Sequence, residues 1–204
     1  MNNKMTIVMD STYWQKKSND FRHAKSVGEY PDKGKTLNWI KKKGACNLGI
    51  PVEEMTVVDV ALHHSILPRQ ELLDDSKRCT SLVHDVSDWV DLGIRPVLYK
   101  LAPANNGKKY FEKEVDVGLA LDAYATAIAN QVSIVALVAG DRDFRPLLDR
   151  LSASGIKTLL VCHPGTTSKR LADAATYTVS LHDEIEKDPD LCSEIFGVYM
   201  PQAA

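Results

Sequence analysis

The stretch Ile134–Arg145 reads I-V-A-L-V-A-G-D-R-D-F-R, and it decides the fold that we expect. An uninterrupted apolar run ends at Gly140, carboxylates follow at Asp141 and Asp143, and a helical spacing of apolar residues begins at Phe144. A fully apolar strand is typical of a parallel sheet that is covered on both faces. Acidic groups directly after such a strand lie where open parallel α/β sheets keep their sites. The stretch therefore predicts an α/β protein with a site at this strand end.

Composition narrows the class of protein. The chain has 204 residues, 44% hydrophobic and 25% charged, which is ordinary for one large globular domain. Its formal net charge of −2 means that binding to nucleic acid would need a local basic patch. The four cysteines form no C-x-x-C pair, which argues against a zinc ribbon and fits reduced thiols. Without a signal pattern or an apolar run of about 20 residues, we expect a cytoplasmic protein that does not contact membranes.

Strands and helices alternate along the rest of the chain, which predicts a doubly wound parallel sheet. The predicted strands are Thr6–Met9, Met55–Leu62, Arg95–Leu101, Ile134–Ala139 and Thr158–Cys162, with an edge strand at Tyr177–Leu181. The predicted helices are Thr36–Lys43, Pro68 or Arg69 to Leu92, Val115 to about Asn130, Phe144 to Ser154, and a short one within Gly165–Ala174. The remaining segments are expected to be a loop or irregular insertion at Lys16–Lys35, a turn at Asn105-Asn106-Gly107 with an edge hairpin returning at Lys109–Glu112, and a short helix with a frayed end from His182 onward.

Two phosphate-binding signatures are missing. No G-x-G-x-x-G follows the first strand, and no G-x-x-x-x-G-K-[ST] occurs in the sequence. A Rossmann dinucleotide site and a P-loop therefore lack their glycine cradles. The first strand offers a carboxylate at this position instead.

Acids from other segments can reach the same edge of the predicted sheet. Asp10 ends the first strand, which neighbours the fourth at the switch point of a doubly wound sheet. Asp116 begins the helix before the fourth strand, and Asp122 follows nearly two turns later. Clustered carboxylates raise one another's pKa unless a cation lies among them, and oxygen ligands select Mg²⁺ or Mn²⁺. One or two such ions can position a water and offset charge on the leaving oxygen of a phosphodiester.

The motifs around these acids resemble those of the NYN domain, a branch of the PIN-like ribonuclease superfamily that includes the LabA/DUF88 proteins. They are V-M-D ending at Asp10, K-E-V-D-V-G-L-A-L-D at Lys113–Asp122, and L-V-A-G-D-R-D-F-R-P-L at Leu137–Leu147. The family wording is close to K-G-V-D-V-x-L-x-x-D and V-S-G-D-x-D-F-x-P-L, and its Ser-plus-acidic-helix end motif resembles Ser168–Asp173. The resemblance covers Thr6 to about Leu181. It implies a single domain over residues 1–204, with a core at about 6–181 and a C-terminal tail at 182–204.

The resemblance also implies a fold and a set of site residues. The fold is a three-layer PIN-like α/β structure, with a central, mostly parallel twisted sheet of about five or six strands flanked by helices. The implied catalytic and metal-binding acids are Asp10, Asp116, Asp141 and Asp143, with Asp122 as a further metal ligand. The expected substrate-binding residues around them are Ser11, Thr12, Tyr13, Arg142, Ser168, Lys169 and Arg170.

The first motif departs from the family at one position. Family members commonly read D-x-x-N after the first strand, whereas this chain reads D-S-T-Y and places Tyr13 where the Asn would stand. Either Ser11 or Thr12 replaces the missing polar group, or the contact with substrate or metal is weakened. The departure puts activity in question, and it leaves the expected fold unchanged.

Ordinary structural roles compete with the functional ones. Asp141 and Asp143 can cap a helix, although one cap needs only one carboxylate, and Asp116 can cap its own helix. Asp122 can pair with a neighbour on an exposed helix face. Asp10 is harder to explain structurally, because an apolar strand gains nothing from a terminal acid. The adjacent histidines at 63 and 64 would point to opposite faces of a strand, so a shared ion is not expected.

The leading hypothesis is a divalent-metal-dependent endoribonuclease, with Mg²⁺ or Mn²⁺ at the carboxylates and single-stranded or structured RNA as substrate. One alternative is an inactive NYN-like module that binds RNA or a protein partner, motivated by Tyr13. A lower alternative is a metal-dependent phosphohydrolase of nucleotides or phosphate esters. A homodimer or a complex with a protein partner is left open.

Overall fold

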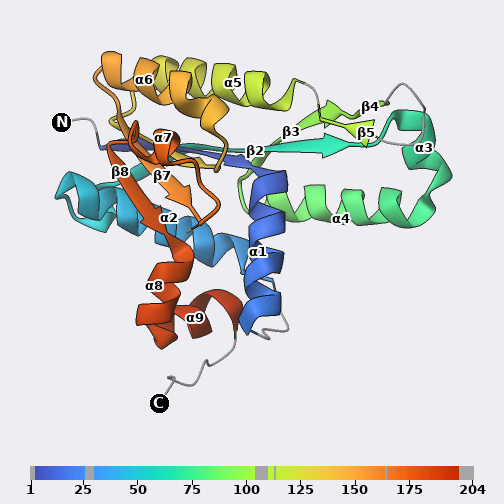
Figure 1. Ribbon diagram of the computed structural model, residues 1–204, viewed down its shortest axis with the longest axis horizontal. Coiled ribbons are helices and arrows are strands. Elements are labelled where there is room, and N and C mark those ends of the chain that lie inside the picture. Colours follow the sequence, from blue (N-terminus) through green and yellow to red (C-terminus); the bar gives the residue numbers. More distant parts are fainter. Residues whose placement is uncertain (1–2, 26–29, 104–109, 113, 164, 198–204) are drawn as a thin grey trace.

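The computed structural model describes residues 3–25, 30–103, 110–112, 114–163 and 165–197. Its central element is a six-stranded parallel sheet in the order β3-β2-β1-β6-β7-β8 (Figure 1). The strands are β1 (Lys4–Asp10), β2 (Thr56–Ile66), β3 (Arg95–Lys100), β6 (Ile134–Val138), β7 (Lys157–Cys162) and β8 (Tyr177–Ser180). The chain builds one half of the sheet outward from β1 to β3 and the other half outward from β6 to β8. The predicted neighbourhood of the first and fourth strands is therefore confirmed, and it forms the switch point.

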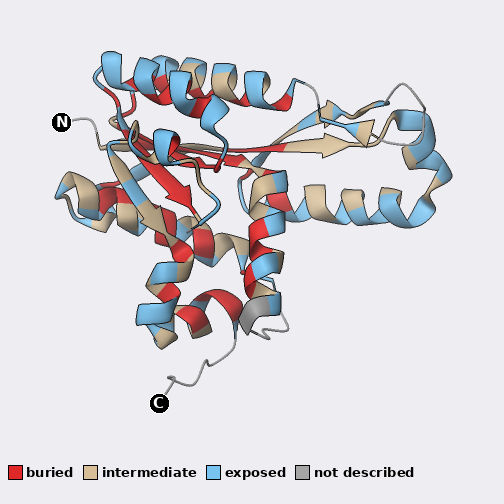
Figure 2. Cartoon of the chain, viewed as in Figure 1, coloured by how far each residue is buried: buried red, intermediate tan, exposed pale blue. Residues whose placement is uncertain are grey.

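Helices cover both faces of the sheet, which gives the expected three layers. One face packs against α5 (Val115–Ala129), α6 (Arg145–Ala153) and α7 (Lys169–Ala172). The opposite face packs against α1 (Ser11–Lys25), α2 (Lys33–Leu48), α4 (Ser76–Asp91), α8 (Leu181–Lys187) and α9 (Pro189–Phe196). Every residue of β6 is buried, because the strand carries side chains into both layers (Figure 2).

Alternation along β1 separates the two faces. Met9 points into the α2 layer, whereas Val8 belongs to the α5 layer, so Asp10 emerges on the side of α5. The same rule separates the adjacent histidines of β2. His63 contacts Asp122 on α5, and His64 packs against a tryptophan of α4. The prediction that the two histidines point apart is confirmed.

The buried face of α5 is formed by Val115, Leu119, Ala123 and Ala127, which contact the sheet and recur every four residues. A second apolar stripe of the helix lies largely outside, with exposures of 64% for Val117, 67% for Leu121 and 46% for Ile128. The helix is apolar nearly all round, so spacing alone cannot select a face. Small side chains are buried here because they let the helix approach the sheet closely.

Three predicted segments need correction. The expected loop at Lys16–Lys35 is mostly helical, since α1 runs to Lys25 and α2 already begins at Lys33. The long helix expected up to Leu92 is broken at Asp75 into α3 (Arg69–Asp74) and α4. The Asp75 carboxylate accepts a hydrogen bond from the backbone N–H of Arg78 at 3.1 Å, so it ends one helix and caps the next.

The C-terminal segment is part of the core. We expected one short helix and a frayed end, but α8 and α9 bury Ile185, Cys192, Ile195 and Phe196 against the sheet layer. Asp188 caps α9 by accepting hydrogen bonds from two backbone N–H groups. Residues 198–204 lie outside the described part of the chain.

A short hairpin joins β3 to α5. Strands β4 (Ala102–Pro103) and β5 (Tyr110–Phe111) pair antiparallel, which confirms a hairpin return, while the turn expected at residues 105–107 lies outside the described residues. A 3-10 turn, η1 (Val52–Glu54), precedes β2, and a second, η2 (Arg142–Phe144), follows β6. No helix in the described ranges is long and apolar enough to cross a membrane.

Candidate functional site

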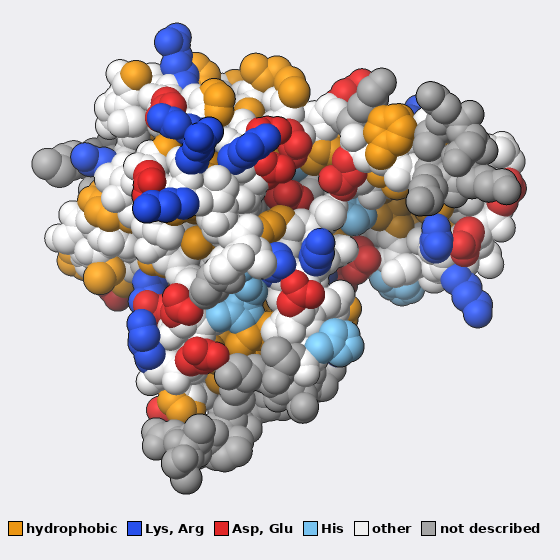
Figure 3. Space-filling view, in the orientation of Figure 1, with side chains coloured by type: hydrophobic (Ala, Val, Ile, Leu, Met, Phe, Trp, Pro, Cys, Tyr) orange, Lys and Arg blue, Asp and Glu red, His pale blue; other side chains and the backbone are white. Residues whose placement is uncertain are grey.

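The carboxyl ends of β1, β6 and β7 border an open cleft of about 640 Å³. We call it the acidic cleft, and its lining residues are Asp10, Thr12, Tyr13, Lys16, Lys17, Gly140, Asp141, Arg142 and Gly165 to Ser168. Figure 3 shows acidic side chains gathered between the starts of α1 and α5, with lysine and arginine side chains beside them. The cleft lies at the switch point, where a doubly wound sheet leaves space beyond its strand ends.

Asp10 is held by the first turn of α1. The backbone N–H of Tyr13 donates to its carboxylate at 3.0 Å, so Asp10 caps the helix. This cap is the structural role that the sequence did not suggest. Burial and, after it, the charges of Glu112 and Asp116 together raise the pKa of Asp10 from 3.8 to about 6. The ionised form of Asp10 is therefore unfavourable in the folded chain, and the carboxyl group is half protonated near pH 6.

Asp116 faces the same group of charges from the first turn of α5. Its pKa is raised by burial, and after burial by the charges of Asp141, Glu112 and Asp143. Together with Asp10, these four acids form one electrostatic unit of five carboxylates, which we call the carboxylate cluster. The four predicted catalytic acids thus converge, and Glu112 joins them. Mutual repulsion of this kind is relieved by a cation.

Asp141 and Asp143 stand on η2 at the open side of the cluster. Asp141 caps this turn by accepting a hydrogen bond from the backbone N–H of Asp143 at 3.0 Å. Helix capping therefore explains one oxygen of the Asp141 carboxylate and does not explain Asp143. The Asp143 side chain is 71% exposed, and it forms a long ion pair of 3.7 Å with Arg142. Its carboxylate gains little from that exposed pair, so capping and pairing leave Asp143 without a strong structural role.

The chemistry of the cluster fits a hard divalent ion, because its donors are all carboxylate oxygens. Its spacing is more open than that of a formed site: within the described ranges, no three His, Cys, Asp or Glu side chains are close enough to hold an ion together. Asp10 and Asp141 each place one oxygen on a backbone N–H, and each keeps a second oxygen. A cation would relieve Asp10 and Asp116, whose pKa values are raised by burial and by neighbouring acids.

Tyr13 forms one wall of the acidic cleft. Its hydroxyl lies 3.2 Å from the Thr167 hydroxyl and accepts a hydrogen bond from the backbone N–H of His163 at 2.8 Å. Its ring lies directly on Gly140, where an added Cβ would come within 2.3 Å of the ring. The glycine of the G-D-R-D motif therefore makes room for Tyr13. This tyrosine bridges α1 to the loop after β7, so it is a structural part of the cleft.

Not all predicted substrate-binding residues lie in the cleft. Thr12, Tyr13, Arg142 and Ser168 line it. Ser11 is buried and pairs with the ring of His64 at 2.6 Å on the opposite side of the sheet, so its assignment to the cleft was wrong. Lys169 and Arg170 are exposed on α7 and do not line the cleft.

Asp122 belongs to a different network. It contacts the guanidinium of Arg95 at 2.9 Å and His63 at 3.1 Å, and Asp59 also binds Arg95, at 2.8 Å. Burial lowers the pKa of His63, with Asp122 opposing this effect. The second nitrogen of His63 pairs with the hydroxyl of Tyr99 at 3.0 Å. The prediction of Asp122 as a metal ligand is therefore not supported by its position.

This network still bears on the cleft, because it fixes the start of α5. The Tyr99 ring packs so closely on Gly118 that an added Cβ would lie 2.1 Å from the hydroxyl. Gly118 follows Asp116 by two residues on the same helix. Asp122, His63 and Tyr99 are therefore positioning residues for the first turn of α5.

Sequence reasoning missed three polar residues of the site. Lys16 and Lys17 line the cleft from α1, in a stretch that we expected to be a loop. Lys17 is tied to Asp20 at 2.8 Å, whereas Lys16 is exposed. Glu112 accepts a hydrogen bond from the hydroxyl of Thr12 at 2.6 Å. Reading Asp10 as a helix cap would have placed both lysines on the cleft side of α1.

Comparisons with known proteins identify a family and a fold. A sequence model described as the NYN domain matches residues 74–183, more than half of the chain. The match includes Asp116, Asp141 and Asp143, and it begins after Asp10. No curated protein sequence matches the chain. A crystal structure from Vibrio parahaemolyticus, described as a protein of unknown function, is similar over 87% of this chain and 91% of that one, with 22% identity and a TM-score of 0.57. That similarity supports the fold alone.

Proposed function

The chain belongs to the NYN domain family of the PIN-like superfamily, and from this we propose that it is a divalent-metal-dependent endoribonuclease acting at the carboxylate cluster. NYN domains are generally nucleases. Metal dependence and an RNA substrate are the steps that we add. The observation that carries the proposal is that Asp10, Asp116, Asp141 and Asp143 lie at the switch point, where burial and then the charges of neighbouring acids raise the pKa values of Asp10 and Asp116.

The residues of the acidic cleft would have distinct roles. Asp10, Asp116, Asp141 and Asp143 would hold Mg²⁺ or Mn²⁺, with Glu112 at their side. A divalent ion supplies a more acidic water and offsets charge on a phosphodiester. Lys16 and Arg142 would bind the phosphate backbone, because both line the cleft and both are exposed. Tyr13 and Ser168 would contact the RNA strand along the wall of the acidic cleft.

The test is cleavage of end-labelled single-stranded and hairpin RNAs by the full chain, with Mn²⁺, Mg²⁺ or EDTA. We expect cleavage with either metal and none in EDTA. Replacing Asp141 by Asn is expected to lower the rate by at least about a hundredfold, the scale for loss of an electrostatic group that stabilises the transition state. DNA of the same sequence shows whether the ribose is needed.

Asp149→Asn is the matched control. Asp149 is an exposed acid on α6 that pairs with Arg145 at 3.4 Å, outside the cleft. We expect this variant to cleave RNA like the wild-type chain. If Asp141→Asn and Asp149→Asn retain equal activity, or if no metal supports cleavage, the proposal is wrong.

A second candidate function is RNA binding without cleavage. Two observations favour it: Tyr13 stands where the family pattern has Asn, and the described acids are not yet gathered into a three-ligand site. Filter binding in EDTA separates the two functions. RNA retention that survives Asp141→Asn, without cleavage under any metal, would favour the binding module.

A further inference from the structure

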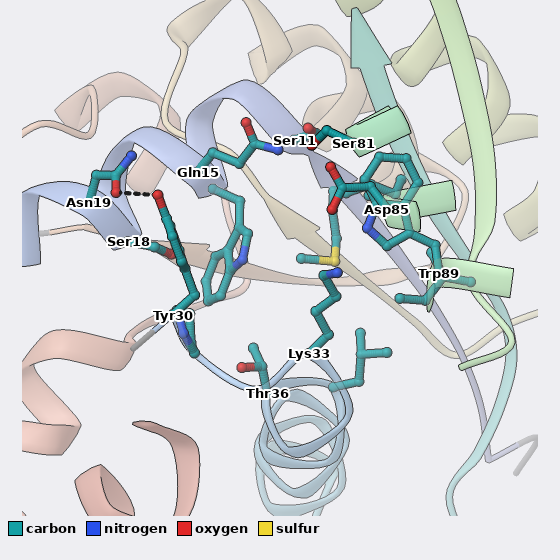
Figure 4. Close-up of a pocket in the computed structure, with 16 residues that line it drawn as sticks. Ser11, Gln15, Ser18, Asn19, Tyr30, Lys33, Thr36, Ser81, Asp85 and Trp89 are labelled. Carbon is teal, nitrogen blue, oxygen red and sulfur yellow. Dashed lines mark hydrogen bonds between the residues drawn. The ribbon is translucent and has the colours of Figure 1, made fainter. Parts of the chain in front are cut away.

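A second cavity, of about 420 Å³, lies on the other face of the sheet between α1, α2 and α4 (Figure 4). We call it the α1–α4 cavity. It is separate from the acidic cleft, and the two share no lining residue. Its volume is within the range of cavities that enclose small organic ligands. Neither the carboxylate cluster nor the Asp122 network uses it.

The walls of the α1–α4 cavity are aromatic and its floor is aliphatic. Trp14 of α1, Trp89 of α4 and Tyr30 before α2 supply the walls, and Met9 and Leu62 of the sheet form the floor. Figure 4 shows Tyr30 and Trp89 on opposite sides of the space. Flat aromatic walls over an apolar floor favour a planar aromatic ligand, because rings stack on such surfaces.

Polar groups are placed at the edges of this apolar space. The carboxylate of Asp85 points inward from α4, and the side chain of Lys33 rises into the space from α2 (Figure 4). Gln15 and Asn19 of α1 add amide groups. The Asn19 oxygen accepts a hydrogen bond from the Tyr30 hydroxyl at 2.7 Å, so Asn19 offers a ligand mainly its donor group. A ligand that fits must therefore be planar, carry hydrogen-bonding edges, and tolerate both a carboxylate and a cation. Lys33 contacts Asp88 at 3.8 Å and lies 5.9 Å from the centre of the Trp89 ring, and such long contacts do little to hold its charge away from a ligand.

From these features, we propose that the α1–α4 cavity binds a nucleobase. The ring would stack among the aromatic walls, the exocyclic amino group of adenine, guanine or cytosine would donate to Asp85, and the attached phosphate would meet Lys33. Uracil has no amino group and would lose the contact with Asp85. The base could come from a free nucleotide or from an RNA strand.

The two sites are adjacent along α1, which makes an RNA strand a realistic source. Met9 ends in the floor of the cavity, and Asp10, the next residue, opens into the acidic cleft. Ser11 lines the cavity and Thr12 lines the cleft. Successive residues at the junction of β1 and α1 therefore face the two sites in alternation. The proposal does not rest on cleavage, because base binding can be measured in EDTA.

The test is equilibrium binding to the full chain in EDTA, by calorimetry and by quenching of tryptophan fluorescence. The probes are AMP, GMP, CMP, UMP, adenosine, and the hexanucleotides A6 and U6. We expect UMP to bind about tenfold more weakly than the other monophosphates, and Asp85→Asn to remove this preference. Trp14→Ala should weaken every base about tenfold. Lys33→Gln should weaken AMP about fivefold and leave adenosine unchanged.

Lys35→Gln, an exposed lysine on the same helix, is the control and should bind like the wild-type chain. Monophosphate binding with the amino-base preference identifies a free nucleotide as ligand. Binding of A6 over U6 without monophosphate binding identifies a base of an RNA strand, provided that Asp85→Asn removes the difference. If nothing binds, or if binding ignores both Trp14→Ala and Asp85→Asn, the proposal is overturned.

Discussion

Replacing Asp10 by Asn is expected to stabilise the chain in EDTA. Burial and neighbouring acids raise the pKa of Asp10 from 3.8 to about 6. Above pH 6, the folded chain therefore carries a charge that the unfolded chain accommodates more easily. Asn keeps the helix cap, because its side-chain oxygen can still accept from the backbone N–H of Tyr13, now 3.0 Å from the carboxylate. The substitution thus removes a charge and retains the local structure.

The pKa shift sets the size and the pH range of this effect. The folded state binds the Asp10 proton more tightly than the unfolded state does, so stability falls as the pH rises from about 4 to about 6. Above that range the full penalty is present. A difference of about two pKa units corresponds to about 3 kcal/mol, which is an upper limit for the gain. In a chain of 204 residues this is a rise in Tm of about 6 to 12 °C.

The assay is thermal and urea unfolding of both proteins in EDTA between pH 4 and pH 8. Asp20→Asn is the matched control on the same helix, because the hydrogen bond from Lys17 lowers the pKa of Asp20 and its charge is therefore favourable. We expect Asp10→Asn to gain stability at pH 8, to lose that gain by pH 4, and Asp20→Asn to show no gain. Equal stabilities of Asp10→Asn and wild type at pH 8 would refute the reasoning.

The same pair of proteins tests the proposed metal site. Mn²⁺ should raise the Tm of the wild-type chain in the pH range where Asp10 is ionised, since a ligand that binds the folded state stabilises it by mass action. Asp10→Asn should lose most of this rise. On this reasoning, the ionised Asp10 carboxylate lowers the stability of the folded chain without metal and contributes to metal binding when Mn²⁺ is present. A charge-neutral variant that responds to Mn²⁺ like the wild type would remove Asp10 from the site.

Three further substitutions test the packing around the cleft. Gly140→Ala should cost about 1 to 3 kcal/mol in urea unfolding, because its Cβ would lie 2.3 Å from the Tyr13 ring; a loss that persists when Tyr13 is also changed to Ala would contradict this cause. Glu114→Gly should stabilise the chain by about 1 kcal/mol, because the N-cap residue Glu114 of α5 has φ at +75°, a conformation that glycine adopts freely. The family pattern K-G-V-D has glycine at this position. An unchanged urea midpoint would argue against strain at Glu114. Asp122→Asn should lower stability by about 1 to 3 kcal/mol through its lost contacts with Arg95 and His63, yet keep the Mn²⁺-dependent rise in Tm; loss of that rise would restore Asp122 to the metal site.

Short-range sequence patterns predicted the helices and strands well where the hydrophobic periodicity agreed with the residues that end such elements. The apolar run at Ile134 to Val138 is a buried strand, and the acids that follow it stand at its carboxyl end, as parallel sheets require. The NYN motifs predicted a three-layer α/β fold, and the structure has one. Prediction was weakest where the pattern allowed two answers. On α5, both stripes are apolar, and only the neighbouring sheet decides that Leu119 is buried and Leu121 is exposed.

The sequence by itself determined the parallel α/β architecture and the adjacency of the first and fourth strands, because these follow from periodicity and from the order of the elements. It also predicted Asp10, Asp116, Asp141 and Asp143 as site residues, from acids at strand ends and at a helix start and from the family motifs, and their role stays a prediction. Only the tertiary structure decided which side each polar residue faces. In the folded chain, Asp122 contacts Arg95 and Ser11 contacts His64. Glu112, which follows the hairpin, contacts Thr12 beside the carboxylate cluster. Such contacts join residues far apart in the chain, and their energies depend on burial and on packing across layers, which a local pattern does not contain.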